Sequence, residues 1–197
     1  MTTYAVDPTT VEYSVAGGSV SLIPTSSLWL QFVPSPDDHF LYMFWSDTQQ
    51  QEHLSAYATD VSGIPQIPSI QTLDVSSLSQ LNIHPSGKFA HAMEVDNSAD
   101  GYISTILLFH IQASGVLQLD SQVQGVYGPA MFATWLYGLS PDGTELYLTS
   151  EDANGPAYWQ RAVNGQNGTL ATDVLLFYPP GGDSVVFGAT LIVDYRD

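Results

Sequence analysis

Three aspartates stand at matching positions of this sequence. Asp47, Asp96 and Asp152 each lie eleven residues after a proline, the prolines being at positions 36, 85 and 141. Carboxylate and carbonyl oxygens are the ligands that Ca²⁺ prefers, so the three aspartates are candidate metal ligands. Glu94 and Glu151 lie close by in sequence and extend the candidate ligand-binding set. The alternative is that each aspartate only closes a turn by accepting hydrogen bonds from its own backbone.

Trp45 adds an aromatic ring to this set, two residues before Asp47. An exposed aromatic ring beside carboxylates can bind a sugar, because the ring stacks on the sugar and the carboxylates accept hydrogen bonds from hydroxyl groups. The alternative for Trp45 is packing in a β-sheet core, where large aromatic side chains are common.

No catalytic nucleophile is identified. The sequence has no cysteine, no G-x-S-x-G motif and no H-E-x-x-H motif. His84 stands where two other repeats have serine, and His91 stands where they have Tyr42 and Tyr147. We therefore expect His84 to be a turn residue and His91 to be buried between repeats, while His39 and His53 look peripheral. Catalytic residues stay unassigned.

These side chains belong to sequence repeats of about fifty residues, and the structure of the repeat must position them. Each repeat contains a motif that consists of a Pro-x-Gly or Pro-x-Asp turn followed by an alternating apolar strand, and the motif occurs at Ser35–Tyr42, His84–His91 and Ser140–Tyr147. Each occurrence is preceded by one strand and followed by a polar loop, a third strand and a glycine turn. The turn glycines are Gly63, Gly115 and Gly165, each six residues after an aromatic. Repeats of this length predict an array of small β-sheets.

The predicted fold is all-β: a β-propeller of four-stranded antiparallel blades. Residues 1–197 form a single partial or small propeller, with whole blades at roughly 28–75, 78–123 and 134–172 and partial blades at 1–20 and 173–197. The two partial blades either join to close a small ring or belong to a larger propeller, completed by further sequence or by a second copy. We favour the larger propeller.

The charge of the chain restricts its partners. Three Lys and Arg against twenty Asp and Glu give a net charge of −17, which excludes nucleic acid as an expected partner because phosphate binding needs clustered cations. No apolar run is long enough to predict membrane insertion. The start of the chain has no signal-peptide pattern. The composition, rich in Ser, Thr, Asn and Gln, slightly favours an extracytoplasmic or cell-surface bacterial protein.

The repeated phrases resemble those of the lactonase-type seven-bladed propellers, which include 6-phosphogluconolactonase, and of the surface-layer propellers with the Tyr-Val-Thr-Asn repeat. The resemblance rests on Ile83–Phe89, on Leu139–Gly143 and on Tyr4–Thr10. It implies the propeller fold, and it implies lactone hydrolysis more weakly, because such motifs build the fold rather than the site. Family chemistry on anionic lactones is expected to use Arg and His. Neither Arg161 nor Arg196 falls on a family motif, so no catalytic residue is carried over.

Two functions follow from these observations. The first is a lactonase-like hydrolase that acts on a sugar lactone, with a carboxylate or His as the general base and Ca²⁺ as a candidate cofactor. The second is a non-catalytic propeller that serves as a binding or scaffold module at the cell surface. A carbohydrate or lactone ligand is expected in either case, and self-association that completes a propeller is a further expectation.

Overall fold

A computed structural model of the chain describes residues 2–6, 13–19, 30–76, 78–98, 101–125, 132–152, 155–172 and 174–177. All regular structure in these ranges is β-strand, as predicted. Within the same ranges there is no helix that is long and apolar enough to cross a lipid bilayer.

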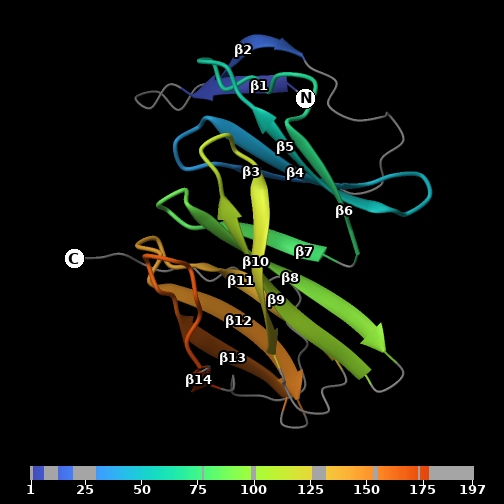
Figure 1. Cartoon of the computed structure of the whole chain (residues 1–197), viewed down its shortest axis with the longest axis vertical. Helices are drawn as coiled ribbons and strands as arrows, with labels where there is room; N and C mark the ends of the chain where they lie inside the picture. Colours follow the sequence, from blue (N-terminus) through green and yellow to red (C-terminus); the bar gives the residue numbers. More distant parts are fainter. Residues whose placement is uncertain are drawn as a thin grey trace.

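Three four-stranded antiparallel sheets follow one another along the long axis of the molecule (Figure 1). In each sheet the strands are neighbours in the order in which they occur in the sequence. The first sheet contains β3 (Leu30–Pro34), β4 (Phe40–Ser46), β5 (Glu52–Ala58) and β6 (Gln71–Val75). The second contains β7 (Leu78–Ile83), β8 (Phe89–Ser98), β9 (Gly101–Ile111) and β10 (Leu117–Gly125). The third contains β11 (Phe132–Leu139), β12 (Glu145–Asp152), β13 (Gly155–Ala162) and β14 (Val174–Phe177).

A two-stranded antiparallel pair, β1 (Thr2–Val6) and β2 (Tyr13–Ser19), precedes these sheets. The predicted propeller architecture is therefore present as three whole blades and a partial N-terminal one, and the described sheets do not close into a ring. The predicted C-terminal partial blade lies mostly in residues 178–197, outside the described residues.

One predicted boundary is wrong. Residues 174–177 were assigned to a following partial blade, but as β14 they pair with β13 and complete the third sheet. The cause is a long turn between the two strands. The backbone N–H groups of Asn167 and Gly168 both donate to the carbonyl oxygen of Asn164, and the Val163–Leu170 bridge follows. Because of these extra turn residues, the fourth strand of the third sheet begins later in the sequence than the repeat predicts.

The same turn corrects the predicted position of a glycine. Gly63 and Gly115 have the positive φ expected of a tight turn, at +71° and +82°. In the corresponding turn of the third sheet, between β13 and β14, the glycine with positive φ is Gly168, at +76°, rather than Gly165.

The turn between the first two strands of each sheet has the chemistry that its sequence predicts. In the third sheet the Ser140 hydroxyl donates to Asp142 at 2.7 Å and accepts from the N–H of Glu145 at 2.9 Å. The Ser35 hydroxyl makes the equivalent pair of bonds with Asp37 and Phe40. These serine bonds lower the pKa of Asp37 and of Asp142. In the second sheet the serine is replaced by His84, whose Nδ1 accepts from the N–H of Ser86 at 3.0 Å, so His84 is the expected turn residue.

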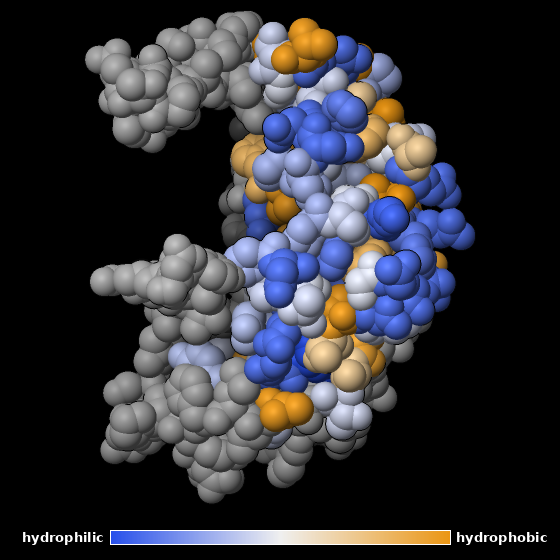
Figure 2. All heavy atoms as spheres, turned by 90° about the vertical axis from the view of Figure 1, so that its left-hand side faces the viewer, coloured by the Kyte–Doolittle hydropathy of each residue, from blue (hydrophilic) through white to orange (hydrophobic). Residues whose placement is uncertain are grey.

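On the face shown in Figure 2, polar side chains of the described residues predominate, with apolar ones between them. Exposed large apolar side chains are few: Phe32, Val61, Ile67, Ile70, Leu119 and Val174. Three of these belong to the connection between β5 and β6.

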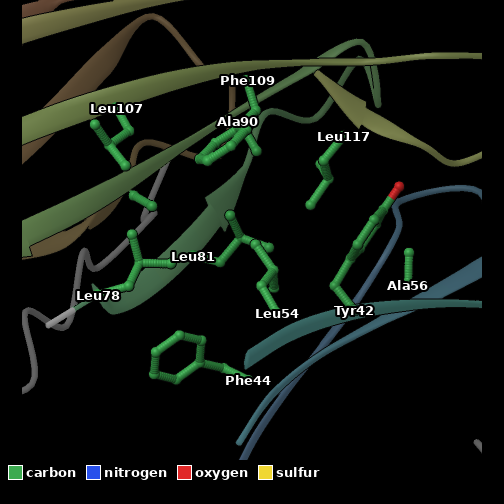
Figure 3. Packing of buried hydrophobic residues seen from close by; sticks show 11 residues of the cluster. Tyr42, Phe44, Leu54, Ala56, Leu78, Leu81, Ala90, Leu107, Phe109 and Leu117 are labelled. Carbon is green, nitrogen blue, oxygen red and sulfur yellow. The ribbon is translucent and has the colours of Figure 1, made fainter. Parts of the chain in front are cut away.

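The core lies between the sheets. One cluster joins the first two sheets, with Tyr42, Phe44 and Leu54 packed against side chains of the second sheet such as Leu81 and Phe109 (Figure 3). A second cluster joins the second sheet to the third through Phe89, Met93, Leu146 and others. Burying one such apolar side chain stabilises the fold by about 1.5–3 kcal/mol. The contact between neighbouring sheets is therefore the unit that stabilises this array.

A polar contact recurs at both interfaces. The Tyr42 hydroxyl of the first sheet donates to the carbonyl oxygen of Gly115 in the second, at 3.0 Å. His91 Nε2 of the second sheet lies 2.7 Å from the carbonyl oxygen of Gly168 in the third. His91 is fully buried, which confirms the expectation that it packs between repeats.

Candidate functional site

A group of side chains that could transfer protons or bind a polar ligand lies across one end of the first sheet. Trp45 on β4, His53 on β5 and Asp74 on β6 are direct cross-strand neighbours. A short turn, Asp47–Gln51, joins β4 to β5 and places Asp47 beside this row. We call Trp45, Asp47, His53 and Asp74 the His53 cluster.

His53 has a carboxylate near each of its ring nitrogens. Its Nδ1 lies 2.9 Å from Oδ1 of Asp74, and its Nε2 lies 3.6 Å from Oδ2 of Asp47. A carboxylate only accepts hydrogen bonds, so the short contact assigns the proton of neutral His53 to Nδ1. The lone pair of Nε2 is then directed to the Asp47 side of the ring.

Trp45 covers one face of His53. The two ring centroids lie 4.3 Å apart with a tilt of 30°. The indole Nε1 donates to the Ser55 hydroxyl at 3.0 Å, and that hydroxyl lies 3.0 Å from Oγ1 of Thr72. This chain of contacts fixes the indole, and through it the orientation of the imidazole. Only 13% of the His53 side chain is exposed, against 78% for Asp74.

Asp47 closes its turn by accepting backbone hydrogen bonds, which was the alternative to metal binding. Its Oδ1 accepts the backbone N–H groups of Gln49 at 2.8 Å and Gln51 at 2.9 Å. Desolvation acts to raise the pKa of Asp47, but these two bonds and the neighbouring His53 outweigh it, and the pKa is lowered. Asp47 is therefore an anion that also faces His53.

The other predicted site residues lie at the equivalent end of the next two sheets. Glu94 lies on β8 and is half-buried, with its Oε1 3.4 Å from the Ser76 hydroxyl. Asp96 was expected in a loop, but β8 continues to Ser98 and Asp96 pairs with Ile103 in the ladder. Glu151 and Asp152 are the last residues of β12. Whether the aspartates form a calcium site stays a prediction, because the side chains of Asp96, Glu151 and Asp152 lie outside the described part of the chain.

Metal binding has no support from the described side chains. No three His, Asp or Glu residues among them are arranged to hold a metal ion.

The sequence interpretation missed His53 and Asp74. It regarded His53 as peripheral because no motif surrounds it. The signal that could have found it is the short Asp47–Gln51 turn, which fixes the register of β4 on β5 and sets Trp45 opposite His53. Trp45 itself, predicted to be exposed, is half-buried.

Comparisons with known proteins agree with the fold. No family model matches the chain, and no curated protein sequence matches it. Among solved structures, a candidate 6-phosphogluconolactonase from Bacteroides uniformis is 21% identical and aligns with 85% of this chain at a TM-score of 0.53. The periplasmic gluconolactonase of Pseudomonas aeruginosa is 14% identical over 88% of this chain, at a TM-score of 0.44. A candidate 6-phosphogluconolactonase from Bacteroides fragilis is 14% identical over 91%, at a TM-score of 0.30.

The first of these similarities establishes the fold and leaves the activity open. This chain spans 48% of the length of the Bacteroides uniformis protein and 62% of the Pseudomonas aeruginosa protein. The shared architecture is the β-propeller fold, of which the described residues contain three consecutive whole blades.

Proposed function

We propose that this chain belongs to a propeller that hydrolyses a neutral sugar lactone, with His53 as the general base. The observation that carries the proposal is the position of His53 between two carboxylates, 2.9 Å from Asp74 and 3.6 Å from Asp47. The propeller likeness to a candidate 6-phosphogluconolactonase supports the choice of substrate class.

The reaction needs one proton acceptor near the lactone carbonyl. Nε2 of His53 takes a proton from water while the water oxygen forms a bond to the carbonyl carbon. The ester C–O bond of the ring then breaks, and the proton passes from His53 to the departing ring oxygen to give a hydroxy acid. Asp74 holds the tautomer, and together with Asp47 it stabilises the imidazolium that forms between the two proton transfers.

The charge of the chain selects a neutral lactone over a phosphorylated one. The net charge is −17, and it repels an anionic substrate. Among the described residues the Lys and Arg side chains are Lys88 and Arg161, and Arg161 is buried. Neither belongs to the His53 cluster. The carboxylates of Asp47 and Asp74 are suited instead to accept hydrogen bonds from sugar hydroxyl groups.

The test follows acid release from δ-gluconolactone and from its 6-phosphate, with uncatalysed hydrolysis subtracted and with or without added Ca²⁺. We expect the unaltered chain to hydrolyse the neutral lactone, and His53→Gln and Asp74→Asn to lower kcat by about 100-fold, as for a lost general base. His110→Gln is the matched control, because His110 forms a similar contact with Asp120 at 3.4 Å on the second sheet. A requirement for Ca²⁺ would support the calcium prediction.

Equal rates for the unaltered chain and His53→Gln would overturn the catalytic role of His53. Binding of the lactone without hydrolysis would favour the second function, a non-catalytic binding module.

A further inference from the structure

Two Asn-Gly pairs lie in the turn between β13 and β14, at Asn164-Gly165 and at Asn167-Gly168. An Asn-Gly pair can modify itself, because the backbone nitrogen of the glycine can attack Cγ of the asparagine side chain. Glycine has no Cβ to shield that nitrogen, and its backbone reaches conformations that other residues avoid. The two pairs have the same sequence, but their atoms have different contacts in the folded chain.

The Asn167-Gly168 pair is protected. The N–H of Gly168 donates to the carbonyl oxygen of Asn164 at 2.7 Å. Gly168 is buried, and a Cβ there would lie 2.6 Å from the ring of Phe89. Oδ1 of Asn167 accepts two hydrogen bonds from Thr169, from its backbone nitrogen at 3.1 Å and from its hydroxyl at 2.8 Å. Both the attacking nitrogen and the side chain that it would attack are therefore held in place.

The Asn164-Gly165 pair is accessible. Gly165 is exposed, and a Cβ on it would meet no atom within 4 Å. Its N–H makes no hydrogen bond in the described part of the chain. Oδ1 of Asn164 accepts the N–H of Gln166 at 2.9 Å. This bond turns the asparagine side chain back over the main chain, so Cγ stays near the nitrogen of Gly165.

We propose that Asn164 is a site of self-modification, at which the chain converts asparagine to aspartate and isoaspartate. The nitrogen of Gly165 gives up its proton to solvent and bonds to Cγ of Asn164, while the side-chain nitrogen takes a proton and leaves as ammonia. Water then adds to the cyclic imide and breaks one of its C–N bonds. Breaking the bond to Cγ gives aspartate, and breaking the bond to the backbone carbonyl carbon gives isoaspartate. In total, one water is taken up and one ammonia is released.

The isoaspartate product alters a turn that supports the interface between the second and third sheets. The carbonyl oxygen of Asn164 accepts the N–H groups of Asn167 and Gly168. That carbonyl leaves the main chain when the link to Gly165 passes through Cγ. The carbonyl of Gly168 is the group that His91 contacts at 2.7 Å, so loosening the turn should weaken this contact. The aspartate product keeps the main chain intact, and neither product depends on the lactone chemistry.

The test incubates the whole folded chain at mildly alkaline pH and locates the modified asparagines by mass spectrometry of its peptides. We expect Asn164 to react about ten-fold or more faster than Asn167, because attack at Asn167 must first break the hydrogen bond of Gly168. In urea the two pairs should react at similar rates, since the contacts that distinguish them are lost. The third Asn-Gly pair of the sequence, Asn154-Gly155, is followed separately, because Asn154 lies outside the described residues.

Gly165→Ala separates the chemistry from the fold. Its Cβ would meet no atom within 4 Å, so the turn is kept, while the methyl group hinders the attacking nitrogen. This variant should slow the reaction at Asn164 by about five-fold or more and leave the rate at Asn167 unchanged. Equal rates at Asn164 and Asn167 in the folded chain overturn the proposal. So does an unchanged rate at Asn164 in the Gly165→Ala protein.

A second measurement tests the effect on the interface. The isoaspartate form is separated from the unaltered chain by chromatography, and both are unfolded in urea. We expect the isoaspartate form to unfold at a lower urea concentration. Asn164→Asp is the matched control, because it carries the new charge in an unaltered main chain, and it should unfold like the unaltered protein. An unchanged midpoint for the isoaspartate form would overturn the link between Asn164 and the interface.

Discussion

His91 Nε2 lies 2.7 Å from the carbonyl oxygen of Gly168, 77 residues further along the chain. A carbonyl oxygen only accepts, so this contact assigns the proton of neutral His91 to Nε2. Its Nδ1 is buried and has no hydrogen-bond partner in the described part of the chain. Burial lowers the pKa of His91, the Gly168 contact acts in the opposite direction, and the nearby His84 lowers the pKa further. The interface between the second and third sheets therefore requires a neutral imidazole.

Acid should weaken this interface. The pKa of His91 is below its unfolded value of about 6.5, so the unfolded chain binds the proton more tightly. The stability that neutral His91 contributes is complete above that value and is lost as the pH falls through the folded pKa. Burial also lowers the pKa of His84, which contacts the same interface and lies near Asp142. Urea unfolding at pH 5 to 8 should show a smaller loss of stability on acidification for His91→Gln than for the unaltered chain. An identical pH dependence in the two proteins would contradict this assignment.

The Tyr42 hydroxyl offers a test of the same contact at the other interface. Tyr42→Phe keeps the buried ring but leaves the Gly115 carbonyl without its donor. We expect a loss of about 1–3 kcal/mol in the free energy of unfolding, the cost of an unpaired buried polar group. Urea denaturation at pH 7 measures it. A loss below about 0.3 kcal/mol would mean that water replaces the hydroxyl at no cost.

Glycine is required at Gly115 for two separate reasons, its φ of +82° and the ring of Phe40. Gly115→Ala should lower the free energy of unfolding by about 2–5 kcal/mol, because strain in the left-handed region and overpacking add. Gly165→Ala is the matched control, since its Cβ would meet nothing within 4 Å. It should change stability by less than about 1 kcal/mol. Similar losses for the two variants would show that Phe40 moves away without cost.

The Ser140 hydroxyl closes the turn before β12 from both sides, as a donor to Asp142 and as an acceptor from Glu145. Ser140→Ala should lower the free energy of unfolding by about 1–2 kcal/mol, because two hydrogen bonds are lost at a buried position. Thermal unfolding compared with Ser62→Ala, at an exposed turn serine, measures the difference. A Ser140→Ala protein as stable as Ser62→Ala would show that the proline and glycine alone determine this turn.

The repeat carried enough information to predict the sheets, because the Pro-x-Gly turn and the apolar alternation after it are local. The same locality explains the wrong boundary at Val174, since the bonds of Asn164 that lengthen its turn give no periodic signal. The contact of Asp74 with the rest of the His53 cluster could not be predicted from the sequence, for a different reason. The members of this cluster come from three strands and one turn, and Asp74 approaches His53 only through a register that depends on the twelve-residue connection, 59–70, between β5 and β6. A contact between residues on neighbouring strands that are joined by a long connection leaves no motif in the sequence.

The middle sheet is the one described sheet that is covered on both faces by other whole sheets, through two separate clusters of side chains. Cooperativity in such an array passes only between nearest neighbours. Backbone amides of β8 and β9 should therefore exchange with solvent most slowly, and the outer sheets should open first. Loss of either outer sheet would uncover one of these two clusters, so the stability of the middle sheet depends on both of its neighbours.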